Sequence, residues 1–494
     1  QSLKMILSFR TSRERRCSEV IRVLKHWILP IGVGIAAMLL YVHTLAPGTV
    51  YFQDAAEFQT KIYTLEVLHG SGYVLYQILG RLWTLLVPLG TIAWRVNLFS
   101  ALLSAISLIV LYRILQEAGV RAWAAVGACG ILACSRVFWA HSIMASVYTM
   151  HTALLALAVL TLLAWQAGRR SPIWFAVVCG IGLSHHRAFI VALPAFAFAI
   201  LLDPRCRHRL LKGWVKLGVA AVVPLLLSYL WLAEASDRSL IAVFRYLYFE
   251  ESSFVEYAPS VSAWARHLVR AVQLRVAPPF GLLPTLIAAA GLIAQFRPGF
   301  DEKIQHASTV LLALGIFTLV FFSIAWVAPD AYRFFIQLDL VLAAGWGFAL
   351  NTGWELLRPR LRHRWLAWGT QAAVALLAFA PLIWMYPNNL DALGHLRDGY
   401  ADRVSRKILS TVESDATING GWVLGWPLRY YRDVEHLRPD VQVLIEKPEN
   451  RTNAMDLIES GASVYFRAPM YELDQKGSGY VWVSMATDNL FRAL

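Results

Sequence analysis

The chain has 494 residues, of which 57% are hydrophobic and 16% are charged, and its mean hydropathy is +0.51. Soluble domains are much more polar, so this composition excludes an ordinary soluble protein. The net charge of +13 does not indicate nucleic-acid binding, because most of the excess Lys and Arg residues lie in short loops between apolar segments rather than on one patch.

Apolar segments long enough to cross a bilayer recur over most of the chain, and they predict a mainly α, polytopic membrane protein with about eleven transmembrane helices. The predicted spans are residues 27–46, 97–116, 122–139, 143–166, 172–186, 187–202, 213–232, 279–296, 307–327, 333–352 and 365–386. Residues 27–46 are followed by no small-residue cleavage site, so we expect a retained signal-anchor.

The basic residues predict the orientation of these spans. Lys and Arg gather in the loops that a cytoplasmic N-terminus would place inside, above all between Arg205 and Lys216. Counting residues 73–88 as a span would move that cluster to the outer face, so we interpret them as a helix in the membrane interface. The expected location is the plasma (inner) membrane, with large outside loops at 47–96 and 233–278.

The composition becomes polar after Tyr386, which divides the chain into a membrane domain, 1–386, and a tail, 387–494. The tail alternates extended and helical patterns, which is typical of a small α/β domain, and an odd number of spans places it outside the cell. The strands are predicted at 417–423, 441–445, 463–467 and 480–485, and the helices at 427–437 and 453–460. None of the five cysteines falls in the tail or the outside loops, so neither disulfides nor a Cys-ligated metal are expected.

Two acidic residues, Asp54 and Glu57, follow the first apolar segment. Their spacing places both carboxylates on one face of a helix at the membrane surface, where acidic groups are costly unless they have a function. They are the candidate catalytic residues. The alternative is that they cap and solvate an interfacial helix, because acids are favoured at helix N-termini.

Motifs around this pair resemble a known family. They are Leu45 to Pro47, Phe52 to Thr60, His69 to Tyr76, Ala93 to Ala101, Phe138-Trp139, Val147-Tyr148, Gly182 to His186, Pro329-Asp330, Asn419-Gly420, Pro427-Leu428 and Arg438 to Val441. The pattern resembles the protein O-mannosyltransferase-like branch of the GT-C glycosyltransferase superfamily, over nearly the whole chain. The resemblance implies a GT-C fold, a sugar donor linked to undecaprenyl or dolichyl phosphate, and transfer on the outer face, with Asp54 as the catalytic base and Glu57 beside it.

The chemistry of such a transfer suits these residues. The acceptor hydroxyl must lose a proton, which a carboxylate can accept while nearby cations hold the departing phosphate. Because a lipid phosphate is already a good leaving group, we expect no metal and no cofactor. The predicted partners are a polyprenyl-phosphate sugar with a hexose such as mannose, membrane lipids, a protein or glycan acceptor, and a further subunit of a membrane complex.

Polar residues at the predicted outer ends of the spans are candidates for substrate binding. They are His69, Tyr73, Arg95, Asn97, His141, Tyr148, His185, His186, Arg187, Asp330, Tyr332 and Arg333. Each also has a structural interpretation, in which it shapes a loop, anchors a span at the interface or forms one ion pair. The adjacent histidines diverge around a helix, so they do not indicate a metal site.

Several positions depart from the family pattern. Gly70-Ser71 and Val74 stand where relatives tend to have prolines, Ser146 where they tend to have a glutamate, and Gln337 where a proline is expected. Gly421 to Val423 replaces an acidic, amide-rich stretch. These departures keep a second hypothesis open, a catalytically silent GT-C scaffold that serves as an accessory subunit. A transporter is less well supported, because no inverted repeat or pair of broken helices is evident.

Overall fold

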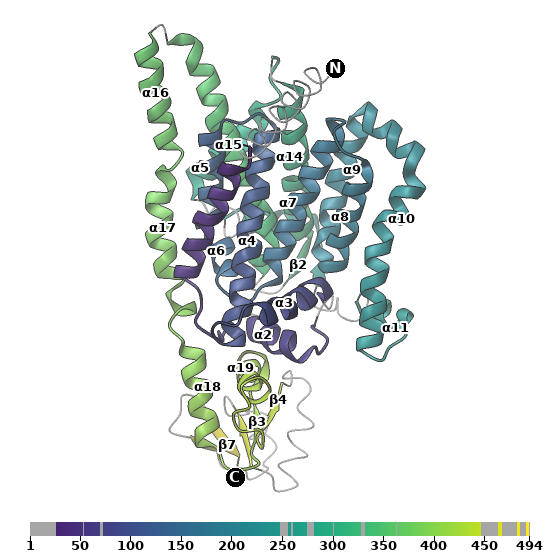
Figure 1. The fold of residues 1–494 in the computed structure, drawn as a ribbon, viewed down its shortest axis with the longest axis vertical. Coiled ribbons are helices and arrows are strands. Elements are labelled where there is room, and N and C mark those ends of the chain that lie inside the picture. The colour runs from purple at the N-terminus through teal and green to yellow at the C-terminus, as the bar shows by residue number, and fades with distance from the viewer. Residues whose placement is uncertain are drawn as a thin grey trace, which may run out of the picture.

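The computed structural model describes residues 26–52, 54–69, 73–247, 255–257, 260–273, 281–299, 301–327, 331–361, 363–445, 463–466, 482–484 and 491–493. Helices form a bundle, and a smaller unit of helices and strands lies at one end of it (Figure 1).

Long helices run along the bundle axis, and shorter ones connect or flank them. The bundle helices are His26–His43, α4 (Ile92–Glu117), α5 (Ala122–Cys134), α6 (Arg136–Ser142), α7 (Val147–Gln166), α8 (Pro172–His185), α9 (Ala192–Leu202), α10 (Pro204–Ala235), α13 (Leu282–Ala294), α14 (Glu302–Ile324), α15 (Ile336–Leu357), α16 (Arg364–Leu377) and α17 (Ala380–Ala392). The short ones are α2 (Ala55–Thr64), α3 (Val74–Leu86), η1 (Arg187–Val191), α11 (Leu240–Arg245), α12 (Val261–Ala271), η5 (Ala331–Phe335) and η6 (Arg358–Arg360).

Each predicted span coincides with an apolar helix or helix pair. Among the described residues, 7 helices are long and apolar enough to cross a membrane, or up to 8 if the bent pair α5 and α6 counts as one span. The chain is therefore a multi-pass membrane protein, and its exact number of crossings stays a prediction. One boundary was wrong: the predicted span 307–327 ends as a helix at Ile324, because Ala325–Val327 forms a strand, β2, that pairs antiparallel with β1 (Val255–Tyr257).

Short polar side chains begin several of these helices. The hydroxyl of Thr91 accepts a hydrogen bond from the backbone N–H of Trp94, and Ser146 does the same for Tyr148. Asp203 caps α10, and Pro204 occupies the first helical position, where its missing N–H costs nothing. These caps fix where each helix starts.

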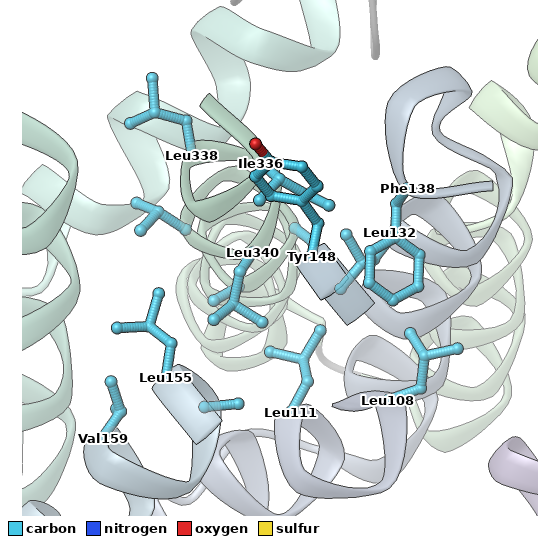
Figure 2. Close-up of a cluster of buried hydrophobic side chains, with 14 of the residues drawn as sticks. Leu108, Leu111, Leu132, Phe138, Tyr148, Leu155, Val159, Ile336, Leu338 and Leu340 are labelled. Carbon is cyan, nitrogen blue, oxygen red and sulfur yellow. The ribbon is translucent and has the colours of Figure 1, made fainter. Parts of the chain in front are cut away.

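Small residues bring α13 and α15 into close contact. A Cβ atom on Gly345 would lie 2.4 Å from the carbonyl oxygen of Ala288, and one on Gly291 would lie 2.3 Å from that of Gly345. Backbones this close are typical of helix packing in lipid, where dispersion contacts replace the hydrophobic effect. The core is apolar where α4, α5, α7 and α15 meet. Of the side chains labelled in Figure 2, all are hydrocarbon except Tyr148, which carries a hydroxyl.

The tail folds as an α/β unit, as predicted. Its elements are η7 (Gly394–Leu396), α18 (Tyr400–Thr411), β3 (Thr417–Asn419), α19 (Gly421–Asp433), β4 (Gln442–Leu444), β5 (Val464–Phe466), β6 (Trp482–Ser484) and β7 (Phe491–Ala493). The sheet order is β4-β3-β5-β7-β6, with β3 parallel to β4 and β5, and β7 antiparallel to β5 and β6.

Some tail elements differ from the prediction. Helix α19 begins at Gly421 rather than 427, although Pro427 lies inside it, and α18 and β7 fall where no element was predicted. The predicted helix 453–460 lies outside the described residues.

The tail packs against the first loop. The carboxylate of Asp402 accepts hydrogen bonds from the backbone and hydroxyl of Thr49 at 2.9 and 2.6 Å. The hydroxyl of Tyr430 accepts one from the backbone N–H of Ala93 at 3.0 Å. Helix α19 lies on α2 (Figure 1). Trp422, near the start of α19, donates a hydrogen bond to Asp54.

Candidate active site

The acidic pair lies at the start of α2. Asp54 is the residue before the helix, and Glu57 is in its first turn, so the two carboxylates share a face as predicted. The side chain of Asp54 makes no capping hydrogen bond with α2. It is 14% exposed, whereas that of Glu57 is 0% exposed. Asp54 is therefore the acid that a substrate can reach.

Three segments distant in sequence contact the Asp54 carboxylate. Arg333 donates to Oδ2 at 2.9 Å, and the indole Nε1 of Trp422 donates to Oδ1 at 3.1 Å. The Nε2 atom of His69 lies 3.6 Å from Oδ2. A carboxylate has about four lone-pair positions, so these donors leave room for a further hydrogen bond.

Glu57 is held by His69 and Lys61. The ammonium of Lys61 donates to Oε1 at 2.8 Å, the backbone N–H of His69 donates to Oε1 at 3.1 Å, and the His69 ring pairs with Oε2 through Nδ1. Burial alone would raise the pKa of Glu57, but His69 and Lys61 together lower it. Glu57 is therefore charged at neutral pH.

The imidazole of His69 bridges the two acids. Burial would lower its pKa, but the carboxylates of Glu57 and Asp54 raise it to about 9. The ring stacks on Phe58 with centroids 5.9 Å apart and meets the edge of Trp422 at 5.1 Å. His69 is thus an imidazolium at neutral pH and contributes a fixed positive charge to the site.

Tyr73 connects this group to a set of buried histidines. Its ring centroid lies 6.0 Å from that of His69, 5.9 Å from that of His185 and 5.5 Å from that of His186. Burial, assisted by the charge of Asp54, raises the pKa of Tyr73, so the phenol keeps its proton. Tyr73 therefore stands between the acids and the histidines.

Tyr148 lies among four buried histidines, called here the histidine group: His141, His151, His185 and His186. Its ring centroid is 5.0 Å from that of His141 and 5.1 Å from that of His186, and the guanidinium of Arg333 lies 5.9 Å from it. Two of the histidines are oriented by hydrogen bonds: His141 Nδ1 to the hydroxyl of Ser146 at 2.8 Å, and His185 Nε2 to the carbonyl of Val147 at 2.9 Å. Arg333 thus lies between the ring of Tyr148 and the carboxylate of Asp54.

Other predicted site residues hold the backbone in place. The amide of Asn97 bonds to the carbonyls of Ala46 and Gly48 and accepts from Gln59 and the backbone of Ala145, at 2.7 to 3.0 Å. Arg95 donates to one carbonyl in the last turn of α3 and to two in the turn between α3 and α4, and Arg187 donates to the carbonyl of Leu247. Asp330 lies outside the described residues, as does the side chain of Tyr332.

Sequence reasoning missed three members of the site. Lys61 follows Glu57 by four residues, the spacing of a helical ion pair, so the pattern did contain a signal for it. His151, whose ring centroid is 5.1 Å from that of His186, lies one helical turn after Tyr148. Trp422 had no local signal, because only the packing of α19 on α2 brings it to Asp54.

No group of three or more His, Cys, Asp or Glu side chains in the described part of the chain is arranged to hold a metal ion. Arg333 and His69 bring positive charge to Asp54, and Lys61 brings it to Glu57.

Comparison with known proteins agrees with the family resemblance that the motifs indicated. Residues 54–209 match the family described as the Protein O-mannosyl-transferase TMEM260 N-terminal domain. The mouse Protein O-mannosyl-transferase TMEM260 is 25% identical over 446 residues, which are 84% of this chain and 62% of that protein. The Dictyostelium discoideum protein of that name is 20% identical over 369 residues, 64% of this chain and 44% of its own. The matched part thus spans about half of these relatives.

Two solved structures share the fold. ArnT from Cupriavidus metallidurans, bound to undecaprenyl phosphate, superposes with a TM-score of 0.61 at 13% identity and covers 95% of this chain and 98% of its own. The oligosaccharyltransferase AglB from Archaeoglobus fulgidus, in complex with an inhibitory peptide and a dolichol-phosphate, gives a TM-score of 0.54 at 13% identity, over 90% of this chain and 70% of its own. The resemblance indicated by the motifs is confirmed: the chain has the fold of the GT-C glycosyltransferases, and its residues 54–209 match the N-terminal domain of the TMEM260 protein O-mannosyl-transferases.

Proposed function

We propose that this chain is a membrane glycosyltransferase that moves a hexose, with mannose the leading candidate, from a polyprenyl-phosphate donor to an acceptor hydroxyl outside the cytoplasm. The observation that carries the proposal is the placement of Asp54, a partly exposed carboxylate between Arg333 and the charged His69. An acid that only capped a helix would need neither cation.

Each group has a role in the proposed transfer. A bond forms between the acceptor oxygen and the anomeric carbon while the bond from that carbon to the phosphate oxygen breaks. The acceptor proton passes to Asp54, and the phosphate leaves with the bonding electron pair. Arg333 lies between Asp54 and Tyr148, so its guanidinium is placed to neutralise that phosphate. His69 and Glu57 hold the site rigid through their paired charges.

The donor class is supported by the proteins that share the fold. One structure contains undecaprenyl phosphate and the other a dolichol-phosphate, and both are long isoprenoid chains with a phosphate at one end. Mannose is supported by the activity named for the mouse and Dictyostelium relatives. A lipid phosphate is already a good leaving group, so we propose that transfer needs no metal ion.

Two observations favour the second candidate, a silent scaffold. Both oxygens of Asp54 already accept a hydrogen bond, from Arg333 and from Trp422, and Ser146 takes the position where relatives tend to carry an acid. The scaffold and the enzyme differ in one measurable property, turnover.

The deciding experiment is an Asp54→Asn variant compared with Asp391→Asn. Asp391 is an exposed acid near the end of α17, and its carboxylate forms no hydrogen bond or ion pair in the described part of the chain, so it controls for the loss of one charge. Purified protein is incubated with radiolabelled polyprenyl-phosphate sugars, and movement of the label is followed. We expect transfer by the wild type and by Asp391→Asn, and none by Asp54→Asn at equal membrane insertion.

The other outcomes separate the candidates. Undiminished transfer by Asp54→Asn would remove Asp54 as the base, whereas absence of transfer by the wild type with every donor would favour the scaffold.

A further inference from the structure

A second site lies at the end of the bundle opposite Asp54. Helix α4 begins next to the tail and ends at Glu117, and α7 begins beside the histidine group and ends at Gln166, so both helices carry the chain to the far end (Figure 1). There, a cavity of about 160 Å³ lies among residues from the ends of α4, α7, α10 and α14. Its volume is roughly that of five water molecules, which is enough for a phosphate group with its five heavy atoms.

Three cationic side chains line this cavity, those of Arg169, Arg205 and Lys303, against the two acids Glu117 and Glu302. The ring of His306 also lines it and lies 3.8 Å from Glu302. Glu117 is already neutralised, because Arg113 and Arg169 both pair with it.

Two of the cations are not used within the protein. Arg205 and Lys303 form no ion pair in the described part of the chain, and both are exposed. They can therefore move to meet an anion at the cavity without breaking an existing pair.

A buried amide gives an independent sign of a ligand. Gln166 lines the cavity and is only 5% exposed, yet its Oε1 atom has no hydrogen-bond partner. Buried polar atoms are nearly always paired, because an unpaired one costs free energy. An amide can turn either its N–H₂ or its oxygen toward a ligand, and so it suits a group with both acceptor and donor atoms.

We propose that this cavity binds a phosphate group, either that of an anionic phospholipid or inorganic phosphate. Arg and Lys are the usual partners of phosphate, and Arg205 and Lys303 both line the cavity. Apolar side chains at the neighbouring end of α9, Leu201 and Leu202, are 53% and 59% exposed and offer a surface for acyl chains. The proposal does not depend on the transfer reaction.

The test measures binding to the full-length chain in detergent by native mass spectrometry. The probes are dioctanoyl phosphatidylglycerol and dioctanoylglycerol, which have the same acyl chains with and without the phosphate. An Arg205→Gln/Lys303→Gln variant is compared with Arg209→Gln/Lys212→Gln, which removes two exposed charges of α10 that do not line the cavity. A third variant, Gln166→Leu, removes the amide at similar volume.

We expect saturable binding of the phospholipid and none of dioctanoylglycerol. Affinity should fall at least about ten-fold in Arg205→Gln/Lys303→Gln, fall in Gln166→Leu, and stay unchanged in the control. Competition by inorganic phosphate would identify phosphate alone as sufficient, and lack of competition would assign the site to the lipid. Equal binding of the two probes, or equal affinity of the two double variants, would overturn the proposal.

Discussion

The charged bridge formed by His69 between the two acids makes stability depend on pH in a defined way. Raising the pKa of His69 from 6.5 to about 9 corresponds to about 3 kcal/mol of stabilisation by its neighbours. Because the pKa is raised on folding, this stabilisation is complete below pH 6.5 and disappears as the pH rises through 9. The pKa of Glu57 is lowered, so its contribution is complete above its ordinary value of 4.5 and disappears as the pH falls below it. The bridge is therefore strongest between about pH 4.5 and 6.5 and is lost above about pH 9.

A His69→Asn variant tests this reasoning. We expect its thermal midpoint in detergent at pH 6 to lie about 4 °C below that of the wild type, since a chain of this size shifts by roughly 1–2 °C per kcal/mol. The difference should shrink toward zero between pH 7 and 10. His208→Asn is the control, because His208 is an exposed histidine on α10 with no hydrogen bond or ion pair in the described part of the chain. A deficit in His69→Asn that is the same at pH 6 and pH 10 would refute the charged bridge.

Two further variants probe the contacts that place the site and hold the bundle. Trp422→Phe keeps an aromatic ring beside His69 but removes the hydrogen bond to Asp54. We therefore expect kcat for sugar transfer to fall about ten-fold with KM for the donor unchanged. Unchanged or faster turnover would show that the indole does not orient the carboxylate. Gly345→Ala introduces a Cβ atom 2.4 Å from a backbone oxygen, so it should lower the thermal midpoint, whereas Gly353→Ala on the same helix, with nothing within 4 Å of its Cβ, should not. Equal midpoints for these two alanine variants would mean that α13 and α15 can separate at little cost.

The helices were predictable because lipid imposes a simple requirement on sequence. A span must satisfy its own backbone hydrogen bonds and be apolar over about twenty residues, so each one is visible locally. Local signals also located α2 and its acidic pair, Asp54 and Glu57. The boundary at Ile324 was missed because the next three residues, Ala325–Val327, are as apolar as the helix but pair with another strand.

The partners of the acids were less predictable, because they depend on contacts between distant segments. Arg333 and Trp422 reach Asp54 from positions 279 and 368 residues away. The stretch Gly421 to Val423 departs from the family pattern, but nothing in it indicated that Trp422, one of nineteen tryptophans, would contact Asp54. Asn97, in contrast, lies within one of the family motifs, Ala93 to Ala101, but its amide holds backbone groups together.

The contact between Trp422 and Asp54 also sets the order in which this protein can mature. Asp54 is made first, and its indole partner follows 368 residues later. At about 5–20 residues per second, translation separates the two by roughly 20–70 seconds. During that interval the nascent chain has inserted most of its helices but still lacks part of the cluster around the acid. A polypeptide released before Trp422 is synthesised would therefore be a membrane-inserted product without the complete cluster.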